Sequence, residues 1–282
     1  MKNARDRRLS FRAILESQAT VFTASVYDPM SARIAEDLGY EVGMLAGSVA
    51  SMTVLGAPDI VLLTLTEFAE QCRRISRASA LPLLVDADHG YGNALNVMRT
   101  IEELDSAGVA ALTIEDTELP ASFGGKSRLI SLEEGVGKMK AAVAARANPE
   151  LVIVGRTSLQ LTGLEDAVAR ARAYEAAGVD SFYIVGVKTR AELDAFYEAL
   201  RIPIILGNAP GDLADLGYLA SRRVRMAQQG HLPIRAAAKA IYDTLQTLRA
   251  GNVPVEADLA PPALMRDLLR EDDYERGAKN FM

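Results

Sequence analysis

The most constraining feature of this sequence is a regular alternation of short, apolar, β-rich runs with segments of helical periodicity. Eight apolar runs occur, and their order along the chain predicts eight strands. The predicted strands are 20–28, 42–49, 81–88, 111–116, 151–157, 181–186, 202–208 and 223–228. Successive strands begin roughly 29 residues apart, close to the ~31 expected when about 250 residues form eight βα units. The pattern predicts an α/β fold built as a single (β/α)8 barrel of the TIM type.

Helical patterns fill the intervals between the predicted strands. They cover 30–39, 66–79, 93–107, 132–147, 163–177, 189–200 and 212–220, with 234–250 after the last strand. Ser131 with Glu134 has the spacing of a capping box, which is typical of a helix start. The competing architecture is an open, doubly wound sheet, which usually has fewer strands and a glycine-rich turn after the first one. Here that turn reads Asp28-Pro29-Met30-Ser31, so the closed barrel is favoured.

The barrel is expected to occupy residues 1–250, because no linker interrupts the pattern before that point. The following segment, GNVPVEADLAPPA, contains three prolines, and 263–281 has the pattern of one or two further helices. Residues 251–282 therefore form a predicted C-terminal helical extension. Two positions are open for it: packing on a neighbouring subunit, or packing on its own barrel.

Charge and cysteine content exclude several classes of protein. With 31 basic and 37 acidic residues the formal net charge is -6, and no basic cluster offers a surface for nucleic acid. One cysteine and two histidines cannot build a disulfide framework or a Cys/His zinc site. The N-terminus lacks the apolar stretch of a signal peptide, and no run approaches about 18 apolar residues. We therefore expect a cytoplasmic enzyme that contacts neither membrane nor nucleic acid.

Polar residues gather where the predicted strands end, which is the face of such barrels that carries the active site. These residues are Asp28, Gly47, Ser48, Asp86, Asp88, Glu115, Asp116, Arg156, Asn208 and, in the loop after the last strand, His231. Among them we select Asp28, Arg156 and His231 as candidate catalytic residues.

Three carboxylates are expected to meet at the barrel mouth. Side chains alternate along a strand, so Asp86 and Asp88 share one face, and Glu115 points inward while Asp116 points to the helix layer. Converging carboxylates repel each other unless a cation or protons intervene. Oxygen ligands favour Mg²⁺, with Mn²⁺ as a substitute, over zinc. A structural salt-bridge network is the alternative interpretation.

The remaining candidates each have a functional and a structural interpretation. Arg156 is either the counter-ion of an aspartate or a planar fork for a substrate carboxylate or enolate oxygen. Gly47 and Ser48 either bind an anion or form a simple turn. His231 is placed to reach a ligand. Cys72 lies within helical periodicity and is expected to be a buried packing residue.

Several motifs together resemble the isocitrate lyase/phosphoenolpyruvate mutase superfamily. They are Asp86-Ala-Asp-His-Gly-Tyr-Gly-Asn93, Ala110-Ala-Leu-Thr-Ile-Glu-Asp116 and Gly155-Arg-Thr157. Within it, Ala24-Ser-Val26, Asp28-Pro-Met-Ser-Ala-Arg-Ile-Ala35 and Gly47-Ser-Val-Ala-Ser51 are most similar to the oxaloacetate decarboxylase branch. The resemblance covers nearly all of the chain. It implies a (β/α)8 barrel, Mg²⁺, small α-keto or α-hydroxy acid substrates, and homodimers or homotetramers that exchange a C-terminal helix.

The resemblance also implies roles for the candidate residues. Asp86 would bind the metal directly, and Asp88 and Glu115 would hold metal-bound waters. Gly47 and Ser48 would bind the C1 carboxylate of the substrate. Arg156 would contact the keto or enolate oxygen, and His231 would face the far end of the substrate.

Departures from the superfamily pattern select the branch. Its carbon–carbon lyases carry a Lys-Lys/Arg-Cys-Gly-His motif after strand 4, whereas 117–127 contains neither Cys nor His. The mutase and phosphonopyruvate hydrolase branches continue Glu-Asp-Lys, where this chain has Thr117, and the exit of strand 8 keeps the Gly230-His231 pair of the decarboxylase branch. The segment 117–130 is expected to close over the site.

The predicted function is Mg²⁺-dependent decarboxylation of oxaloacetate, or a close β-keto acid, to pyruvate and CO₂. Two alternatives stay open: an enzyme acting on a C–P bond, as in phosphonopyruvate, and a catalytically weak barrel that binds a metabolite.

Overall fold

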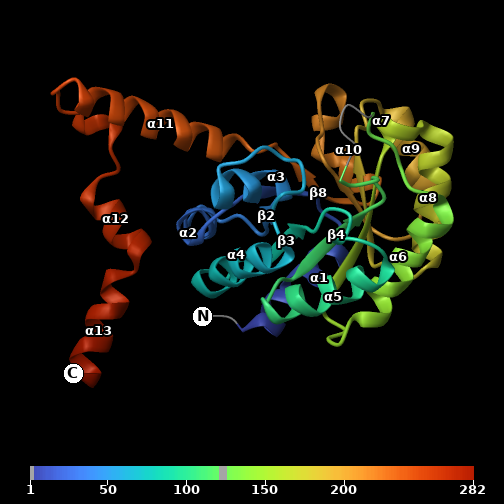
Figure 1. The fold of residues 1–282 in the computed structure, drawn as a ribbon, viewed down its shortest axis with the longest axis horizontal. Coiled ribbons are helices and arrows are strands. Elements are labelled where there is room, and N and C mark those ends of the chain that lie inside the picture. Colours follow the sequence, from blue (N-terminus) through green and yellow to red (C-terminus); the bar gives the residue numbers. More distant parts are fainter. Residues whose placement is uncertain (1–2, 121–125) are drawn as a thin grey trace.

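Eight parallel strands form a closed barrel, in the order in which they occur along the chain. This confirms the predicted TIM-type fold (Figure 1). The computed structural model describes residues 3–120 and 126–282. The strands are β1 Val21–Ser25, β2 Gly43–Leu45, β3 Leu83–Asp86, β4 Ala111–Glu115, β5 Val152–Ser158, β6 Ser181–Val185, β7 Ile204–Leu206 and β8 Val224–Gln228. Strand β1 pairs with β8, which closes the ring.

Helices precede, connect and follow the strands. They are α1 Ala4–Glu16, α2 Pro29–Asp37, α3 Gly47–Ala50, α4 Leu65–Ala78, α5 Ala94–Ser106, α6 Leu132–Ala145, α7 Leu159–Thr162, α8 Leu164–Ala176, α9 Arg190–Ala199, α10 Leu216–Ser221, α11 Leu232–Arg249, α12 Pro262–Leu269 and α13 Glu271–Phe281. Short helices also span Ser51–Leu55 (η1, a π-helix), Gly211–Ala214 (η2) and Glu256–Asp258 (η3). The predicted cap at Ser131 is present, because its side chain accepts a hydrogen bond from the Glu134 amide.

Two predicted elements differ most from the structure. The second strand ends at Leu45, not at 49, because Gly47 begins helix α3, which continues into the π-helix. The helix predicted over 212–220 is divided, because Asp215 accepts a hydrogen bond from the Tyr218 amide and so starts a new helix. Both differences concern loops at the ends of strands, where a run of suitable residues does not reveal how the chain turns.

Apolar side chains form two cores, one on each side of the strands. The larger core fills the space between the strands and the helix ring, with Phe68, Tyr174 and Phe196 among its buried members. The smaller one fills the barrel interior and includes Leu84 and Val152. Burial of this apolar surface supplies the main stabilisation of the fold, at roughly 25 cal/mol per Å².

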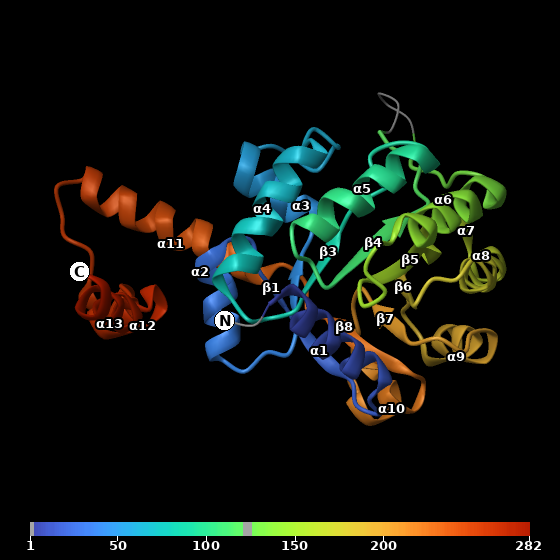
Figure 2. The same cartoon turned by 90° about the horizontal axis from the view of Figure 1, so that it is seen from below.

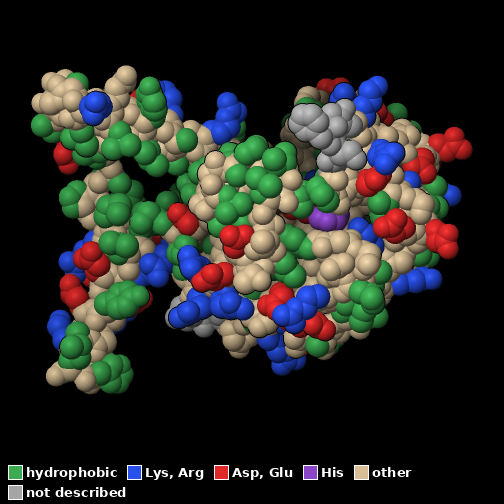
Figure 3. All heavy atoms as spheres, viewed as in Figure 1, with side chains coloured by type: hydrophobic (Ala, Val, Ile, Leu, Met, Phe, Trp, Pro, Cys, Tyr) green, Lys and Arg blue, Asp and Glu red, His purple; other side chains and the backbone are tan. Residues whose placement is uncertain are grey.

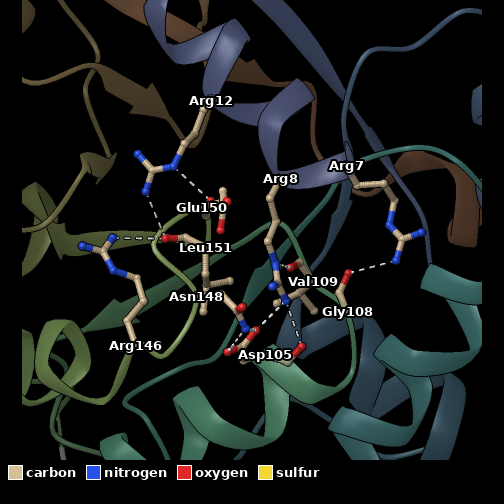
Figure 4. Close-up of polar contacts among 10 residues, drawn as sticks. All are labelled: Arg7, Arg8, Arg12, Asp105, Gly108, Val109, Arg146, Asn148, Glu150 and Leu151. Atoms are coloured by element: carbon tan, nitrogen blue, oxygen red, sulfur yellow. Dashed lines mark hydrogen bonds and ion pairs between the residues drawn. The ribbon is translucent and has the colours of Figure 1, made fainter. Parts of the chain in front are cut away.

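Helix α1 closes the N-terminal end of the barrel, opposite the predicted site (Figure 2). Phe11 is fully buried in the interior core. Arg8 forms an ion pair with Asp105 at 2.6 Å, and its Nε donates to the Val109 carbonyl at 3.0 Å (Figure 4). Arg12 donates to the Leu151 carbonyl at 3.2 Å. The arginines of α1 thus bind backbone carbonyls that the strand entrances leave unpaired.

The C-terminal helices leave the barrel. Figures 1 and 2 show α11 extending away from it, and this helix has no buried residue. Helix α11 begins at Leu232 and so lies within the range 1–250 predicted for the barrel. Helix α12 returns to its own α2: Arg33 donates to the Leu268 carbonyl at 2.9 Å, and Arg270 pairs with Asp37 at 2.6 Å. Among the described residues, no helix is long and apolar enough to cross a membrane.

The buried Arg8–Asp105 pair gives a stability prediction. We expect Arg8→Ala to lower the free energy of unfolding by about 3 kcal/mol, because it leaves a buried carboxylate without its cation. Arg5→Ala is the control, since the Arg5 side chain is 73% exposed in its pair with Glu150, and it should cost less than about 1 kcal/mol. Urea denaturation measures both. Equal losses would contradict the role of α1 as the closure of the barrel.

Candidate active site

A cavity of about 350 Å³ lies at the C-terminal end of the strands. It is lined by Met44, Ala46, Ser48, Asp59, Val61, Asp86, Asp88, Glu115, Leu119, Arg156, Tyr183, Val185, Gly207, Gln228, Gly230 and His231. Six residues selected from the sequence thus meet in one cavity, although they come from five different strand ends. The closed barrel places them together because all parallel strands end on the same face.

Arg156 lies between two of the carboxylates. Its guanidinium pairs with Asp86, and its second amino group lies 3.1 Å from Glu115 Oε2. Asp86 Oδ1 accepts a hydrogen bond from the Thr113 hydroxyl at 3.0 Å. The guanidinium also lies 5.4 Å from the centre of the Tyr183 ring. Arg156 is therefore the counter-ion of Asp86 and Glu115. This is the structural one of the two roles that the sequence predicts for it.

Asp88 is held in an unusual backbone conformation directly after β3. Its φ of 48° is in the left-handed region, and its carbonyl accepts a hydrogen bond from the Glu115 amide at 2.8 Å. Gly47 packs against it: a Cβ at Gly47 would lie 2.6 Å from Asp88 Oδ1. Gly47 does not line the cavity and instead gives the Asp88 carboxylate the space that it occupies.

The cavity carries uncompensated negative charge. Burial, together with the charges of Asp86, Glu115 and Asp59, raises the pKa of Asp88 to about 8. Burial also raises the pKa of Glu115, against the opposing effect of Arg156. With all groups ionised, four carboxylates and one guanidinium give the lining a formal charge of -3. A bound cation would relieve this repulsion.

The donor set fits Mg²⁺ as a partly hydrated ion. Within residues 3–120 and 126–282, no three Asp, Glu, His or Cys side chains converge closely enough to form a ready metal cage. Mg²⁺ is usually bound through one or two carboxylates and keeps several waters, so it needs no such cage. The oxygen donors of Asp86, Asp88 and Glu115 surround one cavity and are of the type that this ion prefers.

His231 forms the opposite wall of the cavity, at the start of α11. Its Nδ1 lies 2.9 Å from the hydroxyl of Ser25. Burial lowers the pKa of His231, which favours the neutral form of the ring. Ser48 lines the cavity from the first turn of α3.

Two strand-end residues do not reach the cavity. Asp28 caps helix α2, where its carboxylate accepts the Ser31 amide at 2.7 Å. Asn208 accepts the neighbouring Ala209 amide at 2.9 Å, and the cavity is lined there by Gly207 instead. The structure thus gives Asp28 a local structural partner and does not bring it together with the other candidate residues.

Asp116 and Cys72 occupy the positions that strand alternation and helical periodicity predict. Asp116 faces the helix layer, where Tyr174 donates to it at 2.8 Å and Thr157 at 2.9 Å. Cys72 is fully buried, which raises the pKa of its thiol and leaves it a packing residue. Of the segment 117–130, residues 121–125, and with them Gly124 and Gly125, lie outside the described residues. Thr117 and Leu129 form an antiparallel bridge at its base.

Three polar cavity residues were not selected from the sequence: Asp59, Tyr183 and Gln228. Asp59 lies in the loop that follows η1, far beyond the predicted strand end, and burial raises its pKa. Tyr183 lies inside a strand, where it reads as part of an apolar run. The position of Gln228 at the end of β8 was an available signal, because every strand end contributes to this face.

Comparison with known proteins agrees with this geometry. Residues 11–249 match the family described as phosphoenolpyruvate phosphomutase. The chain belongs to this family.

The relatives and solved structures most relevant to this chain carry the names of enzymes. The chain is 56% identical over 279 residues, 98% of its length and 97% of the relative's, to an oxaloacetate decarboxylase from Bradyrhizobium sp. (strain ORS 278). A solved oxaloacetate acetylhydrolase with 3,3-difluorooxalacetate is 26% identical, with a TM-score of 0.86 and 99% of both chains covered. A phosphonopyruvate hydrolase complex with oxalate and Mg²⁺ is 28% identical, with a TM-score of 0.84 and 98% of both chains covered. The resemblance found from the motifs is confirmed: this family member is an oxaloacetate decarboxylase-like enzyme.

The charge of the cavity predicts a pH-dependent gain in stability for Asp88→Asn. The folded-state pKa of Asp88, about 8, lies above its ordinary value of 3.8, so the folded protein loses stability as pH rises between these values. With EDTA present, Asp88→Asn should raise the free energy of unfolding by at least about 1 kcal/mol at pH 8, the equivalent of one pKa unit, and little near pH 4. Asparagine also tolerates the left-handed conformation.

Urea denaturation at several pH values measures this gain. Asp212→Asn, at an exposed side chain outside the cavity, is the matched control and should change nothing. A gain for Asp88→Asn that is the same at every pH would rule out charge repulsion as its cause.

Proposed function

We propose that this enzyme decarboxylates oxaloacetate, or a close β-keto acid, to pyruvate and CO₂ with bound Mg²⁺. The observation that carries the proposal is a cavity that places four carboxylates around one guanidinium and one imidazole. Such a lining suits a metal complex of a dianionic keto acid better than the free dianion. The 56% identity to an oxaloacetate decarboxylase supports the same reaction.

Asp86, Asp88 and Glu115 would hold the ion. Mg²⁺ would supply Lewis-acid stabilisation of the oxyanion that develops at C2, worth several kcal/mol; Mn²⁺ offers the same oxygen preference and is expected to substitute. The role of the three carboxylates is then to set the position of this charge at the barrel mouth.

Arg156 would stabilise the same developing charge from the protein side. Once a cation balances Asp86 and Glu115, its planar fork can turn part of its donors toward the keto or enolate oxygen. Ser48 is placed to donate to the C1 carboxylate. The C3–C4 bond breaks, its electron pair moves toward the C2 oxygen, and C4 leaves as CO₂. The resulting enolate takes up a proton at C3, from water or from His231, to give pyruvate. No covalent nucleophile is required.

Hydrolysis of a phosphonopyruvate-like acid is the second candidate function. It is favoured by the similarity to the phosphonopyruvate hydrolase complex and would use the same carboxylates and Arg156. A weak metabolite-binding barrel is the third possibility, against which the intact set of charged side chains argues.

A homodimer or homotetramer is also part of the proposal. Helix α11 exposes Ile241, Tyr242, Leu245 and Leu248. Figure 3 shows further apolar side chains along the C-terminal helices. Monomeric proteins rarely leave such a continuous apolar surface uncovered. Sedimentation of the full chain at micromolar concentration should give an oligomer, and a monomer would contradict this part.

The reaction is tested with purified enzyme and Mg²⁺ by scoring pyruvate from oxaloacetate against phosphate from phosphonopyruvate. We expect pyruvate formation well above the rate with free Mg²⁺ and no phosphate. Asp86→Ala should lower metal-dependent turnover at least 100-fold, in line with the loss of a metal ligand. Leu95→Ala, at a side chain 74% exposed and outside the cavity, is the control. Pyruvate formation no faster than with free Mg²⁺ would overturn the decarboxylase assignment.

A further inference from the structure

One hydrogen bond behind the cavity defines the chemical state of His231. Its Nδ1 lies 2.9 Å from Ser25 Oγ. Ser25 is on strand β1 and lines a second, mostly apolar cavity between β1, α2 and the start of α11, together with Tyr27, Ile34 and Leu232. His231 lines the active-site cavity, and Ser25 does not. The hydroxyl therefore reaches the ring from the side away from the active site.

Among the described residues, the imidazole is the one group placed to accept the hydrogen of this hydroxyl. Ser25 is 8% exposed, and its side chain has no other hydrogen-bond partner among the described residues. A hydroxyl has one donor and two acceptor lone pairs, and a buried donor left unpaired is more costly than an unused lone pair. A Ser25 hydroxyl that donates to Nδ1 meets this requirement. In a neutral imidazole this places the ring hydrogen on Nε2.

We propose that Ser25 is a positioning residue that fixes His231 as the Nε2–H tautomer, so that His231 donates a hydrogen bond to the distal carboxylate of a β-keto dicarboxylic acid. This inference rests on the proposed function. It assigns His231 to substrate binding and removes it as the source of the proton at C3, because a neutral imidazole N–H is too weak an acid. Besides burial, two charged groups affect the pKa of His231: Asp86 raises it and Arg156 lowers it.

A neutral donor suits a carboxylate that must leave as CO₂. During cleavage of the C3–C4 bond, the negative charge moves from the C4 carboxylate to the C2 oxygen. A cation paired with C4 would stabilise the reactant more than the transition state and slow the reaction. A neutral N–H donor forms a weaker hydrogen bond to the C4 carboxylate, so less binding energy is lost when that carboxylate becomes CO₂.

The tautomer can be measured directly in the metal-free enzyme. The chain has two histidines, so ¹⁵N-histidine labelling gives two ring systems, and His231→Gln identifies the signals of the other one. We expect His231 to show a protonated Nε2 and an unprotonated Nδ1 that accepts a hydrogen bond. In Ser25→Ala this preference should weaken. A protonated Nδ1 in the unmodified enzyme would overturn the proposal, whatever reaction the enzyme catalyses.

Two ligands separate distal binding from general effects. Oxalate lacks a distal carboxylate, whereas 3,3-difluorooxaloacetate has one. With Mg²⁺-loaded enzyme, Ser25→Ala should weaken difluorooxaloacetate about tenfold by calorimetry and leave oxalate within about twofold. Ser25→Thr keeps the hydroxyl and should restore the affinity. Equal effects on both ligands, or no effect on either, would contradict the assignment.

Kinetics distinguish binding from proton transfer. Loss of a contact made equally to substrate and transition state raises KM and leaves kcat nearly unchanged. We expect this for Ser25→Ala, with KM about tenfold higher. His231→Gln, which keeps an N–H donor near the Nε2 position, should retain kcat within about tenfold, whereas His231→Asn should bind the substrate more weakly. A fall in kcat alone, with a shifted pH profile, would instead identify His231 as the acid. Absence of decarboxylation with intact ligand selectivity would refute the proposed reaction and leave the role of Ser25 standing.

Discussion

Repulsion among four carboxylates is the physical constraint around which the active site is organised. Asp59, Asp86, Asp88 and Glu115 share one cavity with a single guanidinium. Arg156 compensates two of them directly, and burial together with the charges of the other carboxylates raises the pKa of Asp88. The barrel tolerates this because its stability comes from elsewhere, from the two apolar cores and from the closure by α1. The charged cavity at the C-terminal ends of the strands is thus separated from the packing of α1 at their N-terminal ends.

The same repulsion explains why local geometry around the site is so specific. Asp88 adopts a left-handed backbone, its carbonyl holds the Glu115 amide, and Gly47 leaves room for its carboxylate. The left-handed backbone of Asp88 carries a conformational cost that an ordinary loop would avoid. Together these features hold the two strand ends so that the carboxylates face one another. A cation bound among these carboxylates would attract all of them, and this electrostatic attraction would offset their mutual repulsion.

The sequence predicts the barrel well because eight strand periods and their spacing follow directly from burial. Asp86, Asp88, Glu115 and Arg156 are found for the same reason: alternation along a buried strand decides which side chains face inward. Loops obey no such period. Asp59 lies in a loop whose path depends on the π-helix before it, and Asp28 is used by the cap of α2, a local hydrogen bond that competes with any role in the cavity. The departure of α11 from the barrel is equally invisible, because an amphipathic helix has the same pattern whether its apolar face packs on its own barrel or elsewhere.

The position of α11 also links the barrel to the chemistry of its last loop. His231 is the residue from which α11 starts, so the direction in which that helix leaves the barrel fixes where the imidazole lies. Ser25 holds the other side of the ring from β1, the strand that pairs with β8 to close the barrel. The β1–β8 pair that closes the barrel and the start of α11 therefore meet at the side chain of His231. Any contact that reorients α11 would act first on this hydrogen bond, and through it on the wall of the cavity that His231 forms.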